Sequence, residues 1–153
     1  MTPASGDLEF LEVAGTVAVV TGGANGIGRG IVRALLEADA TVVVADVEQD
    51  VLDTTVAALS ASHPGRISGV VTDVSDEAST DELAAHVFAL HGRCNLLFNN
   101  AGVGSGGGGR MWTHEPNDWR WCYSVNVFGV ANGIMSFVGQ MLESGEPGHV
   151  VNT

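Results

Sequence analysis

Glycines gather directly behind an apolar run near the start of the chain, in a spacing that suits the binding of a phosphate group. Residues 17–28 read VAVVTGGANGIG, and an apolar helical pattern follows them. Glycine permits positive φ angles and lets a ligand approach the backbone closely. The N-terminus of the helix adds free N–H groups and the positive end of a dipole. The stretch therefore predicts a strand, a tight turn and a helix that can hold a pyrophosphate.

The glycine spacing narrows the class of ligand. It runs Gly22-x-x-x-Gly26-x-Gly28, which differs from the common G-x-G-x-x-G pattern. It also lacks the Gly-Lys-Ser/Thr ending of a phosphate-binding P-loop, so hydrolysis of ATP or GTP is disfavoured. A glycine-rich turn between a strand and a helix, with no ligand, remains an alternative.

An acidic residue follows the glycine turn at a spacing that is typical of dinucleotide-binding sites. Asp46 ends the second apolar run, about 20 residues after the glycine turn, where dinucleotide sites bind the adenosine ribose. Its carboxylate would accept two hydrogen bonds from the ribose diol and would repel a 2′-phosphate. Val47 adds no positive charge. We therefore expect NAD to be preferred over NADP. A solvated turn residue is the alternative for Asp46.

These residues need a scaffold in which strands and helices alternate. The apolar runs and helical patterns predict strands at 17–20, 41–46, 67–71, 95–98 and 148–153, and helices at 26–38, 50–60, 75–91 and 117–142. Ser75 is the expected N-cap of the third helix. Such alternation gives a doubly wound parallel sheet, an α/β fold. Ligands then bind at the carboxyl ends of the strands, where Thr21–Gly28, Asp46, Asp73 and Asn99–Gly102 would share one rim.

Composition excludes several function classes. The 153 residues carry 6 Lys plus Arg against 18 Asp plus Glu, a formal net charge of −12. This charge disfavours nucleic acid or an anionic membrane as partner. We find no apolar run of ~18 residues. Residues 1–13 lack the pattern of a secretory signal and are interpreted as a leader before one domain, 14–153. A cytoplasmic protein is expected, with free thiols at Cys94 and Cys122 and no metal site.

Five motifs in register resemble the N-terminal part of the short-chain dehydrogenase/reductase family. Thr21–Gly28 is similar to the family's cofactor turn, Asp73-Val74 to its adenine-contacting pair, and Asn99–Gly102 to its fourth-strand motif. Trp119–Asn126 resembles the helix that carries the active-site asparagine, and Gly148–Asn152 resembles the fifth strand. The resemblance covers roughly residues 12–153. It implies a Rossmann-type, three-layer α/β/α fold, incomplete after about the fifth strand.

The resemblance also implies roles for individual residues. The turn would hold the pyrophosphate through its backbone, Asp46 the ribose, Asp73 the adenine amino group and Val74 the adenine ring. Asn100 would lie against the nicotinamide half and brace the sheet. The full set assigned to the cofactor is Gly22, Asn25, Gly26, Ile27, Gly28, Asp46, Val47, Asp73, Val74, Asn100, Ala101 and Gly102.

Asn126 is the one catalytic residue that the resemblance assigns, as the asparagine that holds a water in a proton relay. The family's catalytic serine follows the fifth strand, and its Tyr-x-x-x-Lys pair lies further on. The sequence contains no lysine, and Tyr123 has Val127 where that lysine would stand. A tyrosine acid needs the lysine to lower its pKa. We therefore expect no dehydrogenase turnover from these 153 residues.

The resulting hypothesis is an NAD-dependent oxidoreductase that acts on an alcohol or ketone, represented by its cofactor-binding part, with a homo-oligomeric full-length enzyme. The alternatives are a non-catalytic dinucleotide-binding module, a methyltransferase, and an epimerase or dehydratase relative. The three tryptophans are interpreted as packing or loop anchors rather than as a base-stacking platform. The glycine run at 104–109 would be a flexible loop or would border the substrate pocket.

We also expect apolar surface to be left bare. Val150 and Val151 need helices on both faces of the sheet. The long helix around Asn126 resembles the family's dimer-forming helix, with Val125, Phe128, Ile134, Phe137 and Val138 partly exposed. The isolated chain is therefore expected to aggregate or to need a partner.

Overall fold

Five parallel strands form one sheet in the computed structural model, which describes residues 12–104 and 109–153. Their order across the sheet is β3-β2-β1-β4-β5. The strands are β1 Val17–Thr21, β2 Thr41–Asp46, β3 Ile67–Val71, β4 Leu96–Asn99 and β5 His149–Asn152. The order reverses between β1 and β4, so the carboxyl ends of these strands mark the switch point of a doubly wound sheet. The predicted Rossmann-like α/β fold is confirmed.

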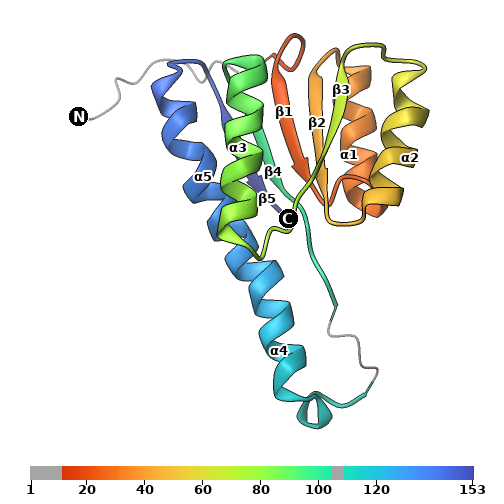
Figure 1. Cartoon of the computed structure of the whole chain (residues 1–153), viewed down its shortest axis with the longest axis vertical. Coiled ribbons are helices and arrows are strands. Elements are labelled where there is room, and N and C mark those ends of the chain that lie inside the picture. The colour runs from red at the N-terminus through yellow and green to blue at the C-terminus, as the bar shows by residue number, and fades with distance from the viewer. Residues whose placement is uncertain (1–11, 105–108) are drawn as a thin grey trace.

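Helices cover both faces of the sheet. Helices α1 (Gly26–Glu37) and α2 (Gln49–Ser60) lie on one face, and α3 (Glu77–His91) and α5 (Gly129–Glu143) lie on the other (Figure 1). Successive side chains of a strand point to opposite faces. Val19 accordingly packs with Leu83 and Phe137, whereas Val20 packs with Leu36 on the other side. The two apolar clusters hold the strand ends in place.

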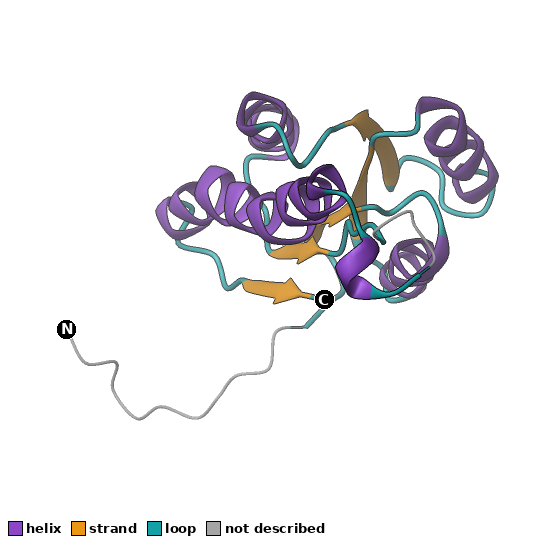
Figure 2. Cartoon of the chain, turned by 90° about the horizontal axis from the view of Figure 1, so that it is seen from below, coloured by secondary structure: helices purple, strands orange, loops and turns teal. Residues whose placement is uncertain are grey.

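The long helix predicted at 117–142 is divided into three parts. Helix α4 (Pro116–Tyr123) follows a short 3₁₀ turn, η1 (Met111–Thr113), and extends past the end of the sheet (Figure 1). Figure 2 shows the molecule from this end, with helices on both sides of the sheet. A π-helical segment, η2 (Ser124–Phe128), joins α4 to α5. A π turn adds a residue to the local repeat, and such turns often accompany functional sites. Asn126 lies within it.

The third helix begins one residue later than predicted. Asp76, not Ser75, is its N-cap, and its side chain accepts a hydrogen bond from the Ala78 N–H. Ser75 instead donates both its N–H and its hydroxyl to Oδ1 of Asp73. The Asp73 carboxylate therefore competes for the serine that would otherwise cap the helix.

One helical stretch, Pro116–Glu143, is long and apolar enough to cross a membrane when it is judged by length and composition alone. The apolar runs of the sequence predicted no such stretch. Within it Asn132, Gly133, Ser136 and Phe137 are buried against the rest of the molecule. A core helix of a globular domain passes the same test as a membrane span.

The expected bare surface is only partly present. Val125 and Phe137 are buried, and the Phe137 ring lies 6.1 Å from that of Phe88, so the expectation was wrong for these two residues. Phe128 and Ile134 are exposed as expected. All four residues of the outer strand β5 are exposed as well. Phe137 faces Phe88 of α3, a covering helix that the expectation had left out of account.

The two thiols are expected to differ sharply in reactivity. Cys94 is 2% exposed, and burial raises the pKa of its thiol to about 12. Because the thiolate is the reactive form, Cys94 should stay unlabelled in the folded chain, while the partly exposed Cys122 reacts. Mass spectrometry after native iodoacetamide treatment should find one label, and Cys122→Ser should remove it. Two labels on the folded chain would contradict this placement.

Candidate functional site

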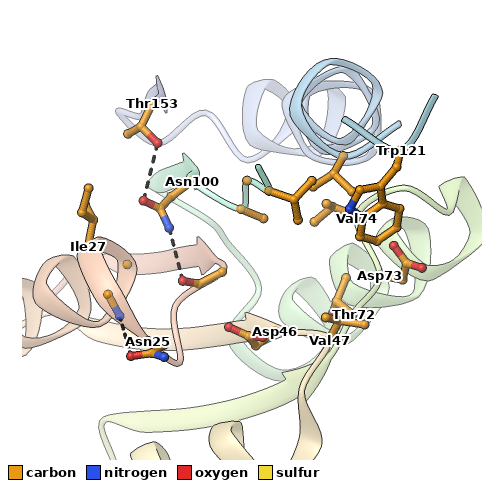
Figure 3. Close-up of a pocket in the computed structure, with 17 residues that line it drawn as sticks. Asn25, Ile27, Asp46, Val47, Thr72, Asp73, Val74, Asn100, Trp121 and Thr153 are labelled. Atoms are coloured by element: carbon orange, nitrogen blue, oxygen red, sulfur yellow. Dashed lines mark hydrogen bonds between the residues drawn. The ribbon is translucent and has the colours of Figure 1, made fainter. Parts of the chain in front are cut away.

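A pocket of about 510 Å³ opens at the carboxyl ends of the strands (Figure 3). Its lining includes every residue that the sequence analysis assigned to the cofactor. These residues are Gly22, Asn25, Gly26, Ile27, Gly28, Asp46, Val47, Asp73, Val74, Asn100, Ala101 and Gly102. The fold therefore brings four separate stretches of sequence to one concave site.

The glycine turn lies so close to the loop after β4 that residues larger than glycine do not fit at Gly22 and Gly28. A Cβ at Gly22, where φ is +60°, would lie 2.8 Å from the Ala101 Cα. A Cβ at Gly28 would meet the Gly22 carbonyl oxygen and lie 2.6 Å from Asn100 Nδ2. Gly26 differs, because it lines the pocket and nothing lies within 4 Å of the position its Cβ would take. That open space is where a ligand can touch the turn.

The first turn of α1 offers hydrogen-bond donors to this space. Asn25 caps the helix, and its Oδ1 accepts the Gly26 N–H at 2.8 Å. Among the described residues, no acceptor binds the N–H groups of Ile27 and Gly28. Free donors at the positive end of a helix suit a pyrophosphate. The residues present therefore fit a dinucleotide.

Asn100 ties the glycine turn to β4. Its Nδ2 donates to the carbonyl oxygens of Thr21 (2.9 Å) and Gly22 (3.2 Å), while Thr21 Oγ1 accepts the Asn100 N–H at 3.0 Å. The hydroxyl of Thr153 lies 3.5 Å from the Asn100 Oδ1. These contacts hold the shape of the turn before any ligand binds.

Asp46 links the end of β2 to the same turn. Its Oδ2 accepts the Ala24 N–H at 3.0 Å, and its Oδ1 accepts the Glu48 N–H at 3.2 Å. A carboxylate has about four lone-pair sites, so each oxygen keeps one for a hydroxyl group in the pocket. Asp46 and Asp73 are the only charged side chains among the lining residues of the described chain. Neither lysine nor arginine is present in this lining.

The loop after β3 is fixed by α5. Asn132 Nδ2 donates to the Val74 carbonyl oxygen at 2.9 Å. At Gly129 a Cβ would come within 2.7 Å of Val74 Cγ2, so the helix can approach the loop closely only because this residue is glycine. Asp73 and Val74 therefore form a rigid wall of the pocket.

Asn126 does not line this pocket but lies beside Gly102 at its edge. It lines a second cavity of about 310 Å³, together with Ala101, Gly102, Val103 and Thr153. Its Oδ1 accepts the Val103 N–H at 2.8 Å, and its Nδ2 donates to the Val103 carbonyl oxygen at 2.9 Å. The amide is thus engaged with the backbone, and its catalytic role stays a prediction.

Comparison with known proteins places the chain in a family. A family model described as "short chain dehydrogenase" matches residues 16–153. The chain belongs to the short-chain dehydrogenase family. This membership removes the methyltransferase alternative.

Relatives of this short-chain dehydrogenase family member are oxidoreductases. It is 39% identical over 140 residues to the C alpha-dehydrogenase of a Sphingobium species, a match that covers 88% of this chain and 44% of that protein. It is 36% identical over 138 residues to the 1-deoxy-11-beta-hydroxypentalenate dehydrogenase of Streptomyces avermitilis, covering 90% and 51%. The chain spans about half the length of the curated relatives it matches.

Solved structures of family members carry different cofactors. A short-chain dehydrogenase/reductase from Burkholderia phymatum in complex with NAD is similar to this chain with a TM-score of 0.87 and 40% identity, over 92% of this chain and 49% of that one. A metagenomic short-chain oxidoreductase in complex with NADP is similar with a TM-score of 0.82 and 33% identity, over 92% and 62%. Family membership therefore leaves the cofactor preference to the residues of the pocket.

Several lining residues of this family member were missed by the sequence analysis. They are Thr72, Val103, Trp121, Val125 and Thr153. Trp121 and Val125 stand four positions apart on a helix, a spacing that puts side chains on one face. This four-residue spacing could have identified Trp121 and Val125 as neighbours. The π turn between α4 and α5 changes the helical repeat, so the sequence did not show which face of the helix the two side chains occupy.

Proposed function

We propose that the chain is the cofactor-binding part of an NAD-dependent short-chain dehydrogenase that transfers hydride between a nicotinamide and an alcohol or ketone. The observation that carries the proposal is the single pocket in which the glycine turn, Asp46, Asp73-Val74 and Asn100–Gly102 converge. A non-catalytic dinucleotide-binding module and an epimerase or dehydratase relative remain the alternatives.

The charges in the pocket support NAD over NADP. NADP carries a phosphate on the ribose 2′-oxygen, where the Asp46 carboxylate would repel it. A phosphate at this position needs a nearby arginine or lysine, and none lines the pocket in the described residues. The ribose diol of NAD would instead donate to Asp46.

NAD when bound supplies the acceptor of the hydride, and residues of this chain position it. The Ile27 and Gly28 N–H groups would bind its phosphate oxygens, and Asp46 would bind its ribose. Asn126 holds the Val103 backbone at the edge of the smaller cavity, beside Gly102 and Ala101. We assign the alcohol or ketone to this side of the site.

Binding of NAD to the purified chain tests the proposal through Gly26. Isothermal titration calorimetry should show NAD binding, and Gly26→Ala should weaken it at least about tenfold, because the new methyl group fills the space that a phosphate would occupy. An alanine here also strains the backbone, since φ is +52°.

Gly65→Ala is the matched control for that strain. Gly65 has φ of +75° and open space around its Cβ position, and it lies outside the pocket. Both variants should lose similar stability, but Gly65→Ala should keep the affinity for NAD. Equal affinities of the two variants, or no binding of NAD by the unmodified chain, would overturn the proposal.

A further inference from the structure

The indole of Trp121 is an exposed aromatic surface in the pocket wall. The residue is 48% exposed and lines the pocket. The other two tryptophans have partners: the Arg110 guanidinium lies 5.4 Å from the Trp112 ring, and the His114 ring lies 6.5 Å from that of Trp119. Among the described residues, no such ring or cation contact is found for Trp121.

Trp121 is held in its position by the helix that carries it. It precedes Val125 by four residues, so both side chains reach the same pocket. Val125 is buried, and further along the helix Gly129 and Asn132 pack against Val74. The helix is thus anchored to the loop after β3, and the indole projects from this anchored segment.

The pocket has two ends, and Trp121 stands at one of them. Figure 3 shows Trp121 with Asp73 and Val74 at one side of the pocket, with Asn100 and Thr153 at the other. The smaller cavity beside Asn126 has Thr153 in its lining but not Trp121. Trp121 therefore does not line the cavity to which the alcohol or ketone is assigned.

Asp46, the residue proposed to bind the ribose, determines which half of a bound dinucleotide would lie at the Trp121 end of the pocket. Asp46 ends β2, and the glycine turn that follows β1 takes the pyrophosphate. The adenosine half then extends toward β2 and β3, away from β4. Asp73 and Val74, which follow β3, face that half together with Trp121.

We propose that Trp121 is the surface on which the adenine ring stacks, a role that rests on the proposed function of the pocket. Adenine is flat and aromatic, and an indole offers the largest face for stacking of any side chain. Stacking of one base on one aromatic residue is a substantial share of the affinity of a nucleotide. Trp121 is a binding residue in this account and has no part in the chemistry.

Binding of the two halves of the cofactor tests the proposal separately. Calorimetry with AMP should give at least about a tenfold loss of affinity in Trp121→Ala and most of the affinity back in Trp121→Phe. Nicotinamide mononucleotide should bind all variants equally. Trp119→Ala is the matched control, because Trp119 is similarly exposed on the same helix and lies outside the pocket lining.

Fluorescence gives an independent readout. The chain has three tryptophans, so the double variant Trp112→Phe/Trp119→Phe leaves Trp121 as the only one. AMP should quench its emission, with excitation at a wavelength that adenine does not absorb. Unchanged emission, or AMP affinity that is the same in Trp121→Ala, would overturn the stacking role while NAD binding stands. Failure of the unmodified chain to bind NAD would overturn the proposed function and the stacking role with it.

Discussion

The double variant Asp46→Ala/Val47→Arg is expected to bind NADP more tightly than NAD, the reverse of the preference proposed for the unmodified chain. Removal of the carboxylate ends its repulsion of the 2′-phosphate and its hydrogen bonds with the ribose diol. The arginine then supplies a cation that can form paired hydrogen bonds with the phosphate. Hydrogen bonds to charged groups contribute about 1.5–3 kcal/mol, so the preference should be at least tenfold in each direction.

The ratio of the two dissociation constants, measured by calorimetry, checks this reversal. Asp46 also binds the Ala24 and Glu48 N–H groups, so its loss will lower stability as well. The single variant Asp46→Ala controls for that effect: it should lose affinity for NAD without gaining the full affinity for NADP. An unmodified chain that binds both cofactors equally would contradict the preference.

Gly28→Ala is expected to lower the free energy of unfolding more than a Gly→Ala substitution at any other glycine of the turn. The new Cβ would overlap the Gly22 carbonyl oxygen and crowd Asn100 Nδ2. Both belong to the contacts that join the turn to β4, so neither can move freely. Overpacking of this kind costs about 1–3 kcal/mol, and a backbone collision lies at the upper end.

Gly30→Ala is the matched control in the same helix. Nothing lies within 4 Å of its Cβ position, and alanine is the better helix former by up to about 1 kcal/mol. Urea denaturation should therefore give a lower free energy of unfolding for Gly28→Ala and an equal or higher one for Gly30→Ala. Equal losses in the two variants would show that the turn is not packed as described.

The sequence alone was sufficient for the sheet and for the pocket residues that lie in the loops after β1, β2, β3 and β4, except Thr72 and Val103. Continuous apolar runs such as 41–46 are typical of strands buried on both faces, and all strands are parallel as expected. Polar residues at the ends of such strands must meet at one edge. The sequence therefore predicted that Asp46, Asp73 and Asn100 share a single site, and all three line the pocket.

Features that depend on competition between neighbouring groups were not predictable. Asp73 attracts the Ser75 side chain and so moves the cap of α3 to Asp76. The π turn around Asn126 has no signature in apolar spacing, because apolar residues occur throughout 125–142. For the same reason the sequence indicated neither that Phe137 is covered nor that Trp121 lies in the pocket wall.

An NMR titration of the labelled chain with NAD tests the central claim most directly, because it reports on each backbone amide. NAD should perturb the amides of Gly22–Gly28, Asp73-Val74 and Asn100–Gly102. It should leave those of His63–Arg66, which precede β3 at the opposite end of the sheet, unchanged. Perturbations confined to residues outside the pocket, or none at saturating NAD, would contradict the assignment of this pocket to the cofactor.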